Sequence, residues 1–321
     1  MQRGNDRLAP MQASAPTPPA QPGERPSGSP FPPRMARMSQ WILLGFLAAF
    51  TFGPSAEGAV RELKVMSFNI WVSGGRSLSN CAAAIRVSGA DIVGLQECKP
   101  EAGAWLAKTL GYHVTSHPGI PILSRYPIVQ SLRVEGGSGA IIELAPGQQV
   151  NFFNCHLNPY PYGPYTLRET ARKEKALEHE RSARMPALTK LLEAMKPYLA
   201  GKSPCFLTGD FNAPSHFDYV DLPWPTSLAC IQAGLEDSYH LMNPQRRKYP
   251  GPFAFNEPGV TWTPIVNEEP NGVYDRIDFV YVSSGDGVVV LRSEALDERN
   301  CVKPWPSDHR AVLSQVRLPT T

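Results

Sequence analysis

Residues 205–212 read Cys-Phe-Leu-Thr-Gly-Asp-Phe-Asn, an apolar run that ends with an acid and an amide two positions apart. The short apolar run predicts a buried β-strand whose carboxyl end carries polar groups. Alternate side chains of an extended chain share a face, so Asp210 and Asn212 are expected to point to the same side. A carboxylate and an amide in that arrangement can hold a water and a phosphoryl oxygen next to each other. The alternative interpretation is an Asx turn that opens the loop before Pro214.

Three other predicted strands also end on polar residues. They are Leu63–Asn69, Asp91–Gln96, which Glu97 follows, and Val150–His156. Loops at strand ends are free of sheet pairing, which is why α/β sheets gather ligand sites there. We therefore expect Asn69, Glu97 and His156 to lie near Asp210. Each residue alone also fits a plainer interpretation, since a carboxylate after a strand is often a helix cap or a turn former.

A second polar cluster precedes the last predicted strand. Ser307-Asp308-His309 places a carboxylate beside an imidazole, and adjacent side chains of an extended segment point to opposite faces. Asp308 and His309 are therefore expected to meet different partners, one a metal and the other a phosphate. Asp278 falls inside another predicted strand, where a carboxylate is costly unless it is paired. We expect His309 to be that partner.

The order of the predicted elements indicates a layered α/β sandwich. The remaining predicted strands are Ile122–Ser124, Ile128–Val134, Ala140–Leu144, Thr261–Thr263, Arg276–Val282, Val288–Ser293 and Ala311–Arg317, and the predicted helices are Asn80–Ser88, Glu101–Leu110 and a long one over residues 166–199. Many short strands with few helices between them do not fit a regular alternation of strand and helix. No repeat or linker divides residues 60–321, so we expect one domain there.

The long predicted helix carries mixed charges. Its charged residues include Arg168, Arg172, Lys173, Lys175, Arg181 and Arg184 together with Glu169, Glu174, Glu178 and Glu180. Opposite charges three and four residues apart usually form weak ion pairs on a solvated face. We expect such a face, and the alternative is a basic surface that follows the phosphates of a nucleic acid.

The amino-terminal residues have the composition of an extension and a targeting segment. Residues 1–34 are polar and rich in proline, which predicts a disordered extension. The basic start, the apolar run over residues 41–52 and the small residues that follow predict a signal peptide over residues 35–59. The run is shorter than the ~20 residues of a membrane span, so we expect export to the periplasm or medium and no span after cleavage. An uncleaved anchor is the alternative, and a true start at Met35 or Met38 would make residues 1–34 an artefact of start-site choice.

Charge and cysteine content narrow the function classes. Residues 1–56 hold five of the 31 basic and two of the 29 acidic residues, which leaves 26 and 27 for residues 57–321. A domain without cationic excess does not bind duplex DNA strongly through counterion release, although cleavage of nucleic acid is still allowed. The six cysteines show no zinc-ligand spacing, and the sequence leaves open whether they form disulfides or are buried thiols. We expect a monomer.

Taken together, these motifs resemble the endonuclease/exonuclease/phosphatase family of deoxyribonuclease-I-like, metal-dependent phosphoesterases. The resemblance covers residues 63–317, with every motif in the family's order. Gly209–Phe217, which reads GDFNAPSHF, and Trp305–Arg310, which reads WPSDHR, are most similar to exported bacterial members of undefined substrate. The resemblance implies a four-layer sandwich in which two mainly antiparallel β-sheets pack face to face with helices outside, and an active site at one end.

The resemblance also implies a metal site. Glu97 would ligate Mg²⁺ or Mn²⁺, Asn69 would lie beside it in the first or second coordination shell, and Asp308 would complete the metal environment. These residue types suit the chemistry independently, because a hard divalent cation prefers oxygen ligands and Mg²⁺ needs only one or two carboxylates.

The remaining implied roles concern the reaction itself. Asp210 would orient or deprotonate the attacking water, and Asn212 would hold a phosphate oxygen. His309, oriented by Asp278, would contact the phosphate, and His156 would bind phosphate or protonate the leaving oxygen. Phosphoester hydrolysis needs such a positioned water, charge neutralisation at the phosphate and help for the leaving group.

Candidates for substrate recognition follow from position in the sequence. Three tyrosines, Tyr160, Tyr162 and Tyr165, lie on a proline-stiffened loop shortly after His156, where they can stack on a base or a sugar. The alternative is that this loop packs on the protein's own surface. His216, shortly after the Gly-Asp-Phe-Asn motif, and Arg276 are further candidates.

We therefore expect an exported phosphoester hydrolase that depends on a divalent metal. Direct attack by water is expected, because no GxSxG motif or activated cysteine offers a covalent nucleophile. A phosphodiesterase or nuclease is the first hypothesis. The alternatives are a phosphomonoesterase, a hydrolase of small-molecule or lipid head-group phosphodiesters, and a catalytically silent binding module.

Overall fold

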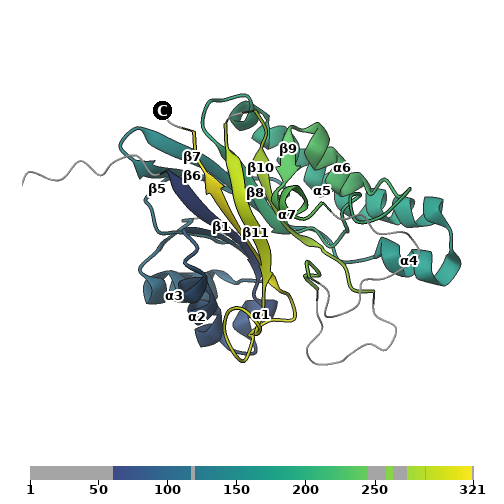
Figure 1. Cartoon of the computed structure of the whole chain (residues 1–321), viewed down its shortest axis with the longest axis horizontal. Coiled ribbons are helices and arrows are strands. Elements are labelled where there is room, and N and C mark those ends of the chain that lie inside the picture. The colour runs from purple at the N-terminus through teal and green to yellow at the C-terminus, as the bar shows by residue number, and fades with distance from the viewer. Residues whose placement is uncertain (1–60, 117–119, 245–257, 263–272, 286, 320–321) are drawn as a thin grey trace, which may run out of the picture. The chain divides into compact units, whose positions relative to one another are not determined.

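The strands form two six-stranded sheets, and helices lie outside them (Figure 1). The computed structural model describes residues 61–116, 120–244, 258–262, 273–285 and 287–319. Each sheet contains one parallel pair of strands and is otherwise antiparallel. The predicted two-sheet α/β sandwich is confirmed. The predicted extension of residues 1–34 and the predicted signal peptide of residues 35–59 lie outside the described residues.

The first sheet is built around the first and last long strands of the domain. Its order is β11 (Val289–Leu296), β12 (Ala311–Arg317), β1 (Glu62–Asn69), β2 (Ile92–Gln96), β4 (Ile122–Ser124) and β3 (His113–Val114). β1 runs parallel to β2 and antiparallel to β12. The carboxyl ends of β1 and β2 therefore lie at the same edge as the start of β12.

The second sheet contains the Gly-Asp-Phe-Asn strand. Its order is β5 (Ile128–Val134), β6 (Gly137–Ala145), β7 (Gln148–His156), β8 (Cys205–Asp210), β10 (Asp278–Ser283) and β9 (Leu235–Asp237). β7 and β8 are parallel, and β10 runs antiparallel to β8. The ends of β7 and β8 and the start of β10 therefore share one edge.

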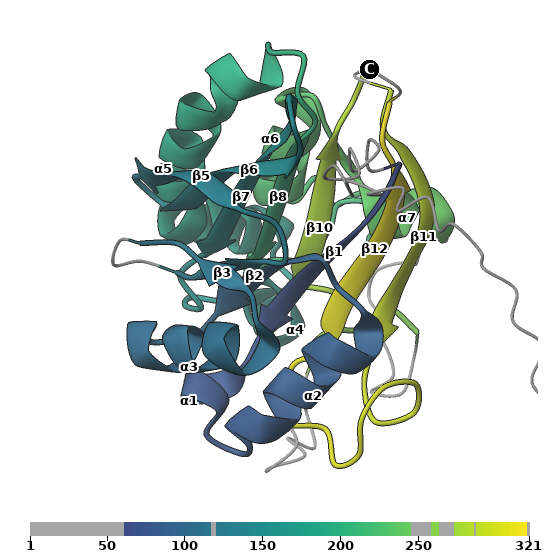
Figure 2. The same ribbon diagram turned by 90° about the vertical axis from the view of Figure 1, so that its left-hand side faces the viewer.

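Helices cover the outer face of each sheet. Figures 1 and 2 show α2 (Leu78–Ser88) and α3 (Pro100–Leu110) on one side of the strands, and α5 (Lys173–Leu199) and α6 (Pro225–Gln232) on the other. Helix α6 and the short helices α1 (Trp71–Gly74) and α7 (Ser238–Met242) were not predicted from the sequence, and α4 (Gly163–Thr170) was not separated from α5. Within the described part of the chain, no helix is both long and apolar enough to cross a membrane.

The long predicted helix is two helices. Ala171 adopts a left-handed conformation (φ 55°), and its N–H donates to the carbonyl of Leu167, which ends α4 before α5 begins. Glycine usually marks such a position, so the alanine gave no signal for the break. Most charged residues of α5 are exposed, as expected, but Glu180 and Arg184 are fully buried.

Apolar side chains between the two sheets form the central layer of the domain. Val65 of β1 and Val312 of β12 face Phe152 of β7 and Phe206 of β8 in one buried cluster. The centroids of the two phenylalanine rings lie 6.4 Å apart. Burial of each such side chain is worth about 1.5–3 kcal/mol, so this layer fixes how the sheets face each other.

A polar network crosses this layer just below the polar strand ends. Gln96 Nε2 donates to Asn154 Oδ1 (2.6 Å), and Asn154 Nδ2 donates to the carbonyl of Leu95 (2.8 Å). Thr208 Oγ1 donates to the same Asn154 oxygen (3.1 Å). Gly94 leaves the space that these side chains occupy. The network ties the second sheet to the strand that ends next to Glu97.

The six cysteines are thiols. None of them forms a disulfide in the structure, and all six belong to described residues. Five are buried and Cys301 is half-buried. Burial raises the pKa of the Cys81 and Cys98 thiols to about 12, so these groups pack as small hydrophobic side chains.

We expect Gly94→Ala to lower the free energy of unfolding by about 1–3 kcal/mol, because overpacking a filled interior has that cost. A Cβ on residue 94 would lie 2.0 Å from Thr208 Oγ1 and 2.6 Å from Asn154 Oδ1. Urea denaturation followed by circular dichroism measures the change. Gly75→Ala is the control, since its Cβ would meet nothing closer than 3.5 Å and its φ is −55°. Equal stability of the two variants would contradict the expected clash.

Candidate active site

Strand register brings three of the predicted site residues into one row. His156 lies opposite Asp210 in the β7–β8 pair, and Asp210 lies opposite Asp278 in the β8–β10 pair. In the other sheet, Asn69 ends β1 beside the end of β2, directly before Glu97. The predicted gathering of polar strand ends at one edge is confirmed.

Asp210 is at the centre of this group. Its side chain is 1% exposed, and its Oδ2 accepts a hydrogen bond from Asn69 Nδ2 (3.0 Å). Its Oδ1 accepts from the backbone N–H of Asn212 (2.9 Å). The Nε2 atoms of His156 and His309 lie 3.5 and 3.8 Å from the same Oδ2. One carboxylate therefore meets polar groups from both sheets.

Glu97 is held by the turn that follows β1. Its Oε1 accepts from Asn69 Nδ2 (3.2 Å) and its Oε2 from the backbone N–H of Val72 (2.8 Å). The backbone N–H of Ser73 donates to the Glu97 carbonyl (2.6 Å). Glu97 and residues 71–74 all have left-handed φ values, between 47° and 74°. For residues other than glycine this conformation costs about 1–3 kcal/mol each and is typical of functional sites.

His309 forms the expected pair with Asp278. Its Nδ1 lies 2.8 Å from Asp278 Oδ2, and both residues are buried. Thr261 Oγ1 accepts from the backbone N–H of Asp278 (3.0 Å), and Trp305 Nε1 donates to the carbonyl of His309 (2.6 Å). With Nδ1 engaged in this way, the Nε2 of His309 is directed toward Asp210.

Electrostatics favour a protonated His309. Burial alone would lower the pKa of His309, but the charges of Asp278 and Asp210, the hydrogen bond to Asp278 and the charge of Asp308 raise it above its usual range. Burial raises the pKa of Asp278, and the charge of His309 opposes that change. The pair therefore presents a cationic N–H at the edge where Asp210 lies.

Asp308 completes a cluster of carboxylates. Burial raises its pKa, the charge of His309 opposes this, and the charges of Glu97 and Asp210 raise it further. Asp210, Asp278 and His309 also have ligand atoms within 4.8 Å of one another. The Asp278–His309 hydrogen bond engages two of these three groups, so Glu97 and Asp308, which border the cleft, are the better oxygen donors for a hard cation.

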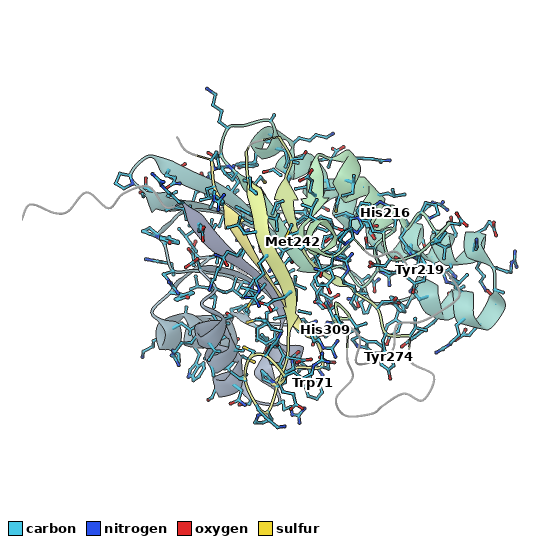
Figure 3. The ribbon with its side chains drawn as sticks, viewed as in Figure 1. Trp71, His216, Tyr219, Met242, Tyr274 and His309 are labelled. Atoms are coloured by element: carbon cyan, nitrogen blue, oxygen red, sulfur yellow. The ribbon has the colours of Figure 1, made fainter. Side chains whose placement is uncertain are left out.

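These groups line a cleft of about 260 Å³. The predicted reaction and metal residues that border it are Glu97, His156, Asp210, Asn212, Asp308 and His309. Asn69 and Asp278 are fully buried behind them. Figure 3 shows His309 and Trp71 at the same end of the sheets.

Tyr162 and Tyr165 of the predicted loop border the cleft. Their rings pack edge to face, with centroids 5.1 Å apart at 86°. The Tyr162 hydroxyl donates to Asp275 Oδ2 (2.7 Å), and the side chain is 9% exposed. Tyr162 therefore exposes little of its surface to the cleft, and its hydroxyl is engaged within the protein.

Two other predicted residues are placed elsewhere. His216 has Nδ1 at 2.8 Å from Ser227 Oγ, and Figure 3 shows it well away from His309. Arg276 is 2% exposed and donates to the carboxylates of Asp218 (3.1 Å) and Asp237 (2.9 Å). Neither residue borders the cleft. Both side chains form hydrogen bonds with other side chains of the protein, so neither is placed to bind a substrate.

Two further aromatic residues border the cleft. Tyr160, the first tyrosine of the predicted loop, is 68% exposed at its rim. Trp262 also borders the cleft and pairs through its backbone with His309. Trp262 and His309 are 47 positions apart in the sequence, so no local pattern predicts their contact.

Comparison with known proteins agrees with this geometry. Residues 66–309 match the Endonuclease/Exonuclease/phosphatase family. An uncharacterized protein of Caenorhabditis elegans is 26% identical over 316 residues, which covers 85% of this chain and 96% of that protein.

Solved structures share the fold. An endonuclease/exonuclease/phosphatase family protein from Bacteroides thetaiotaomicron is 22% identical, with a TM-score of 0.54, over 81% of this chain and 98% of its own. A mannosyl-6-phosphatase from the same species is 21% identical, with a TM-score of 0.52, over 79% of this chain and 99% of its own.

We expect Asp275→Asn to flatten the pH dependence of stability between pH 4 and pH 7. Burial raises the pKa of Asp275 from 3.8 to about 6, against the hydrogen bonds from Tyr219 and Tyr162. The folded state thus favours the protonated acid, so this contribution to stability is present below pH 3.8 and is lost as pH rises through about 6. Between pH 4 and pH 7, the free energy of unfolding of the wild type should therefore fall by about 2–3 kcal/mol through this group. The variant should not show this fall.

Urea denaturation at pH 4 and pH 7 measures this difference. Glu236→Gln is the control, because Glu236 is an exposed carboxylate of β9. An Asp275→Asn variant with the pH profile of the wild type would show that Asp275 does not titrate in this range.

Proposed function

The chain belongs to the endonuclease/exonuclease/phosphatase family, whose members hydrolyse phosphoester bonds, and from this premise we propose that it is a divalent-metal-dependent phosphoester hydrolase that activates water with Asp210. The observation that carries the proposal is the convergence of Asn69, Asn212, His156 and His309 on that one buried carboxylate. Asp210 is fixed in orientation at the cleft, where it can accept a proton from a water that attacks phosphorus.

Three side chains around Asp210 suit the phosphate. A protonated His309 directs a cationic Nε2–H into the cleft, where it can stabilise charge on a phosphoryl oxygen. Asn212 Nδ2 donates one hydrogen to the carbonyl of Leu157 (3.0 Å), which leaves its second hydrogen for a phosphate oxygen. His156 is half-buried at the opposite side of Asp210, where it can protonate the leaving oxygen.

The donor set at the cleft fits a hard cation. Glu97 and Asp308 offer carboxylate oxygens, and a bound Mg²⁺ or Mn²⁺ would neutralise phosphate charge and polarise the phosphoryl group. Asn69 has a supporting role in this proposal. Its Oδ1 accepts from the backbone N–H of Trp71 (3.0 Å), which fixes the amide so that Nδ2 donates to both Glu97 and Asp210.

The substrate we favour is a phosphoester with an aromatic or sugar ring next to the scissile bond. Tyr160, Tyr165 and Trp262 border the cleft, and none of its described lining residues is lysine or arginine. A nuclease or other phosphodiesterase remains the first hypothesis, and a phosphomonoesterase is the second. The solved neighbour that acts as a mannosyl-6-phosphatase has the fold but only 21% identity, so it supports the second hypothesis only weakly.

The proposals on export, oligomeric state and DNA affinity rest on the sequence. We propose export on the signal-like pattern of residues 35–59 alone. We also propose that the protein is a monomer. Strong non-specific affinity for DNA is not expected, because residues 57–321 carry 26 basic and 27 acidic residues. The alternative of a catalytically silent module is disfavoured, since Glu97, Asp210 and His309 all border the cleft.

We expect Asp210→Asn to lower kcat about 10²–10⁴-fold, the usual contribution of general acid–base catalysis. The amide keeps the size of the side chain but can accept only one of the two hydrogen bonds that Asp210 accepts, so the melting temperature should fall, and turnover is compared at a temperature at which both proteins are folded. The assay compares bis(p-nitrophenyl) phosphate, p-nitrophenyl phosphate, single-stranded DNA and double-stranded DNA in parallel. His113→Ala is the control, because His113 is exposed on the edge strand β3. Full turnover by Asp210→Asn on the substrate that wild type prefers would exclude Asp210 as the base.

We expect chelation with EDTA to abolish hydrolysis and Mg²⁺ or Mn²⁺ to restore it. In Glu97→Gln the metal concentration for half-maximal activity should rise roughly 10–100-fold, since a ligating carboxylate is lost. Glu101→Gln is the matched control, because Glu101 is an exposed residue in the first turn of α3. Undiminished hydrolysis by the metal-free protein would refute the metal requirement.

A further inference from the structure

Two buried charges on α5 hold the cleft wall from behind. Glu180 and Arg184 have fully buried side chains, with Arg184 Nη1 3.3 Å from Glu180 Oε2. Arg184 Nη1 donates to the carbonyl of Pro161 (2.8 Å) and its Nη2 to the carbonyl of Pro159 (2.8 Å). Glu180 Oε1 accepts from the backbone N–H of Gly163 (3.0 Å). Three main-chain groups of residues 159–165, here called the tyrosine segment, are thus bound by two side chains.

Stability alone does not account for this ion pair. Burying two charges is costly, and well-packed apolar residues in their place are often as stable or more stable. The exposed pair Arg181–Glu178 on the same helix shows the ordinary arrangement, with half or more of each side chain exposed. The buried pair differs in what it binds, which is the backbone of a segment that borders the cleft.

The close fit of the tyrosine segment against α5 is a second, independent observation. A Cβ on Gly163 would lie 2.7 Å from Glu180 Oε1 and 2.8 Å from the ring of Trp224. Gly163 does not need glycine for its φ value, because the segment enters α4 there with helical geometry. The absence of a side chain therefore serves the close approach of the segment to Glu180.

The same segment is also bound to Asp275, which contacts Trp262 of the cleft. The Tyr162 hydroxyl donates to Asp275 Oδ2 (2.7 Å), and the carbonyl of Asp275 accepts from the backbone N–H of Trp262 (3.3 Å). Asp275 is buried and also accepts from the Tyr219 hydroxyl (2.6 Å). Buried groups therefore connect the tyrosine segment to Trp262, which also borders the cleft.

We propose that Glu180 and Arg184 are positioning residues that fix the tyrosine segment so that it selects phosphoesters carrying an uncharged ring. The inference rests on the proposed function, because it assumes that a phosphoester occupies the cleft. Neither residue touches the substrate, and both act through Tyr160 and Tyr165, which border the cleft.

The test compares a substrate with a second ring and one without it. Bis(p-nitrophenyl) phosphate and methyl p-nitrophenyl phosphate share the leaving group, and for a monoesterase the pair is p-nitrophenyl phosphate and glycerol 3-phosphate. Lysine has one compact ammonium group, which cannot reproduce the geometry in which two separate guanidinium nitrogens donate to the carbonyls of Pro159 and Pro161. In Arg184→Lys the ratio of kcat/KM for the ring substrate over the ringless one should fall roughly tenfold, the size of one aromatic contact. The fall should arise mainly from KM.

A second variant keeps the test valid if Arg184→Lys does not fold. Gly163→Ala displaces the tyrosine segment without altering either charge, and it should lower the same ratio. Arg181→Lys is the matched control, since it makes the same substitution on the exposed face of α5. Leu188→Ala is the control for stability, because Leu188 is a buried residue of α5 in the cluster under the second sheet. It should lower the melting temperature and leave the ratio unchanged.

Hydrogen exchange gives a readout that does not depend on activity. The peptide over residues 157–167 should exchange faster in Arg184→Lys and Gly163→Ala than in wild type, and at the wild-type rate in Arg181→Lys. Faster exchange together with a wild type that hydrolyses no phosphoester would refute the proposed function and leave the positioning role intact. An unchanged ratio and unchanged exchange in folded variants would overturn the inference itself.

Discussion

A buried carboxylate at the end of β8 is the constraint on which the rest of the structure depends. A charge in an apolar interior is costly unless hydrogen bonds and opposite charges surround it. The partners of Asp210 come from β1, from β7 and from the segment before β12, so they belong to both sheets. Both sheets must therefore end at the same edge, and the apolar layer that includes Phe152 and Phe206 keeps them there. The packing of the two sheets and the assembly of the site therefore depend on each other.

Much of this arrangement could be predicted from the sequence, because it depends on local pattern. Apolar runs of five to nine residues marked the long strands, and polar residues at their ends marked one side of the cleft. The pairing of Asp278 with His309 followed from the cost of an unpaired buried carboxylate. A buried carboxylate needs a partner, and few residues of this chain can serve as one, so the pairing could be predicted.

The remainder could not be predicted, because it depends on contacts between distant segments. Glu180 and Arg184 have the same i,i+4 spacing as an exposed ion pair, and only the backbone of the tyrosine segment makes them buried. Arg276 has the charge expected of a phosphate ligand, yet two aspartates of other segments bind it in the interior. An exposed charged residue and a buried one can occur in the same sequence pattern, so the pattern does not show which of the two a charged residue will be.

The two sides of the cleft are held by different means, and this difference has consequences for how the protein can change. Glu97 is fixed by backbone donors of a strained left-handed turn, so its position depends on main-chain geometry that few substitutions preserve. The tyrosine segment is fixed by side chains of α5, which lie behind it and do not touch Asp210. A substitution at residue 180 or 184 is therefore expected to move the wall that meets the substrate, whereas the groups that donate hydrogen bonds to Asp210 belong to other segments. Specificity on this fold can vary without disturbing the groups that carry out hydrolysis, because the two depend on separate sets of contacts.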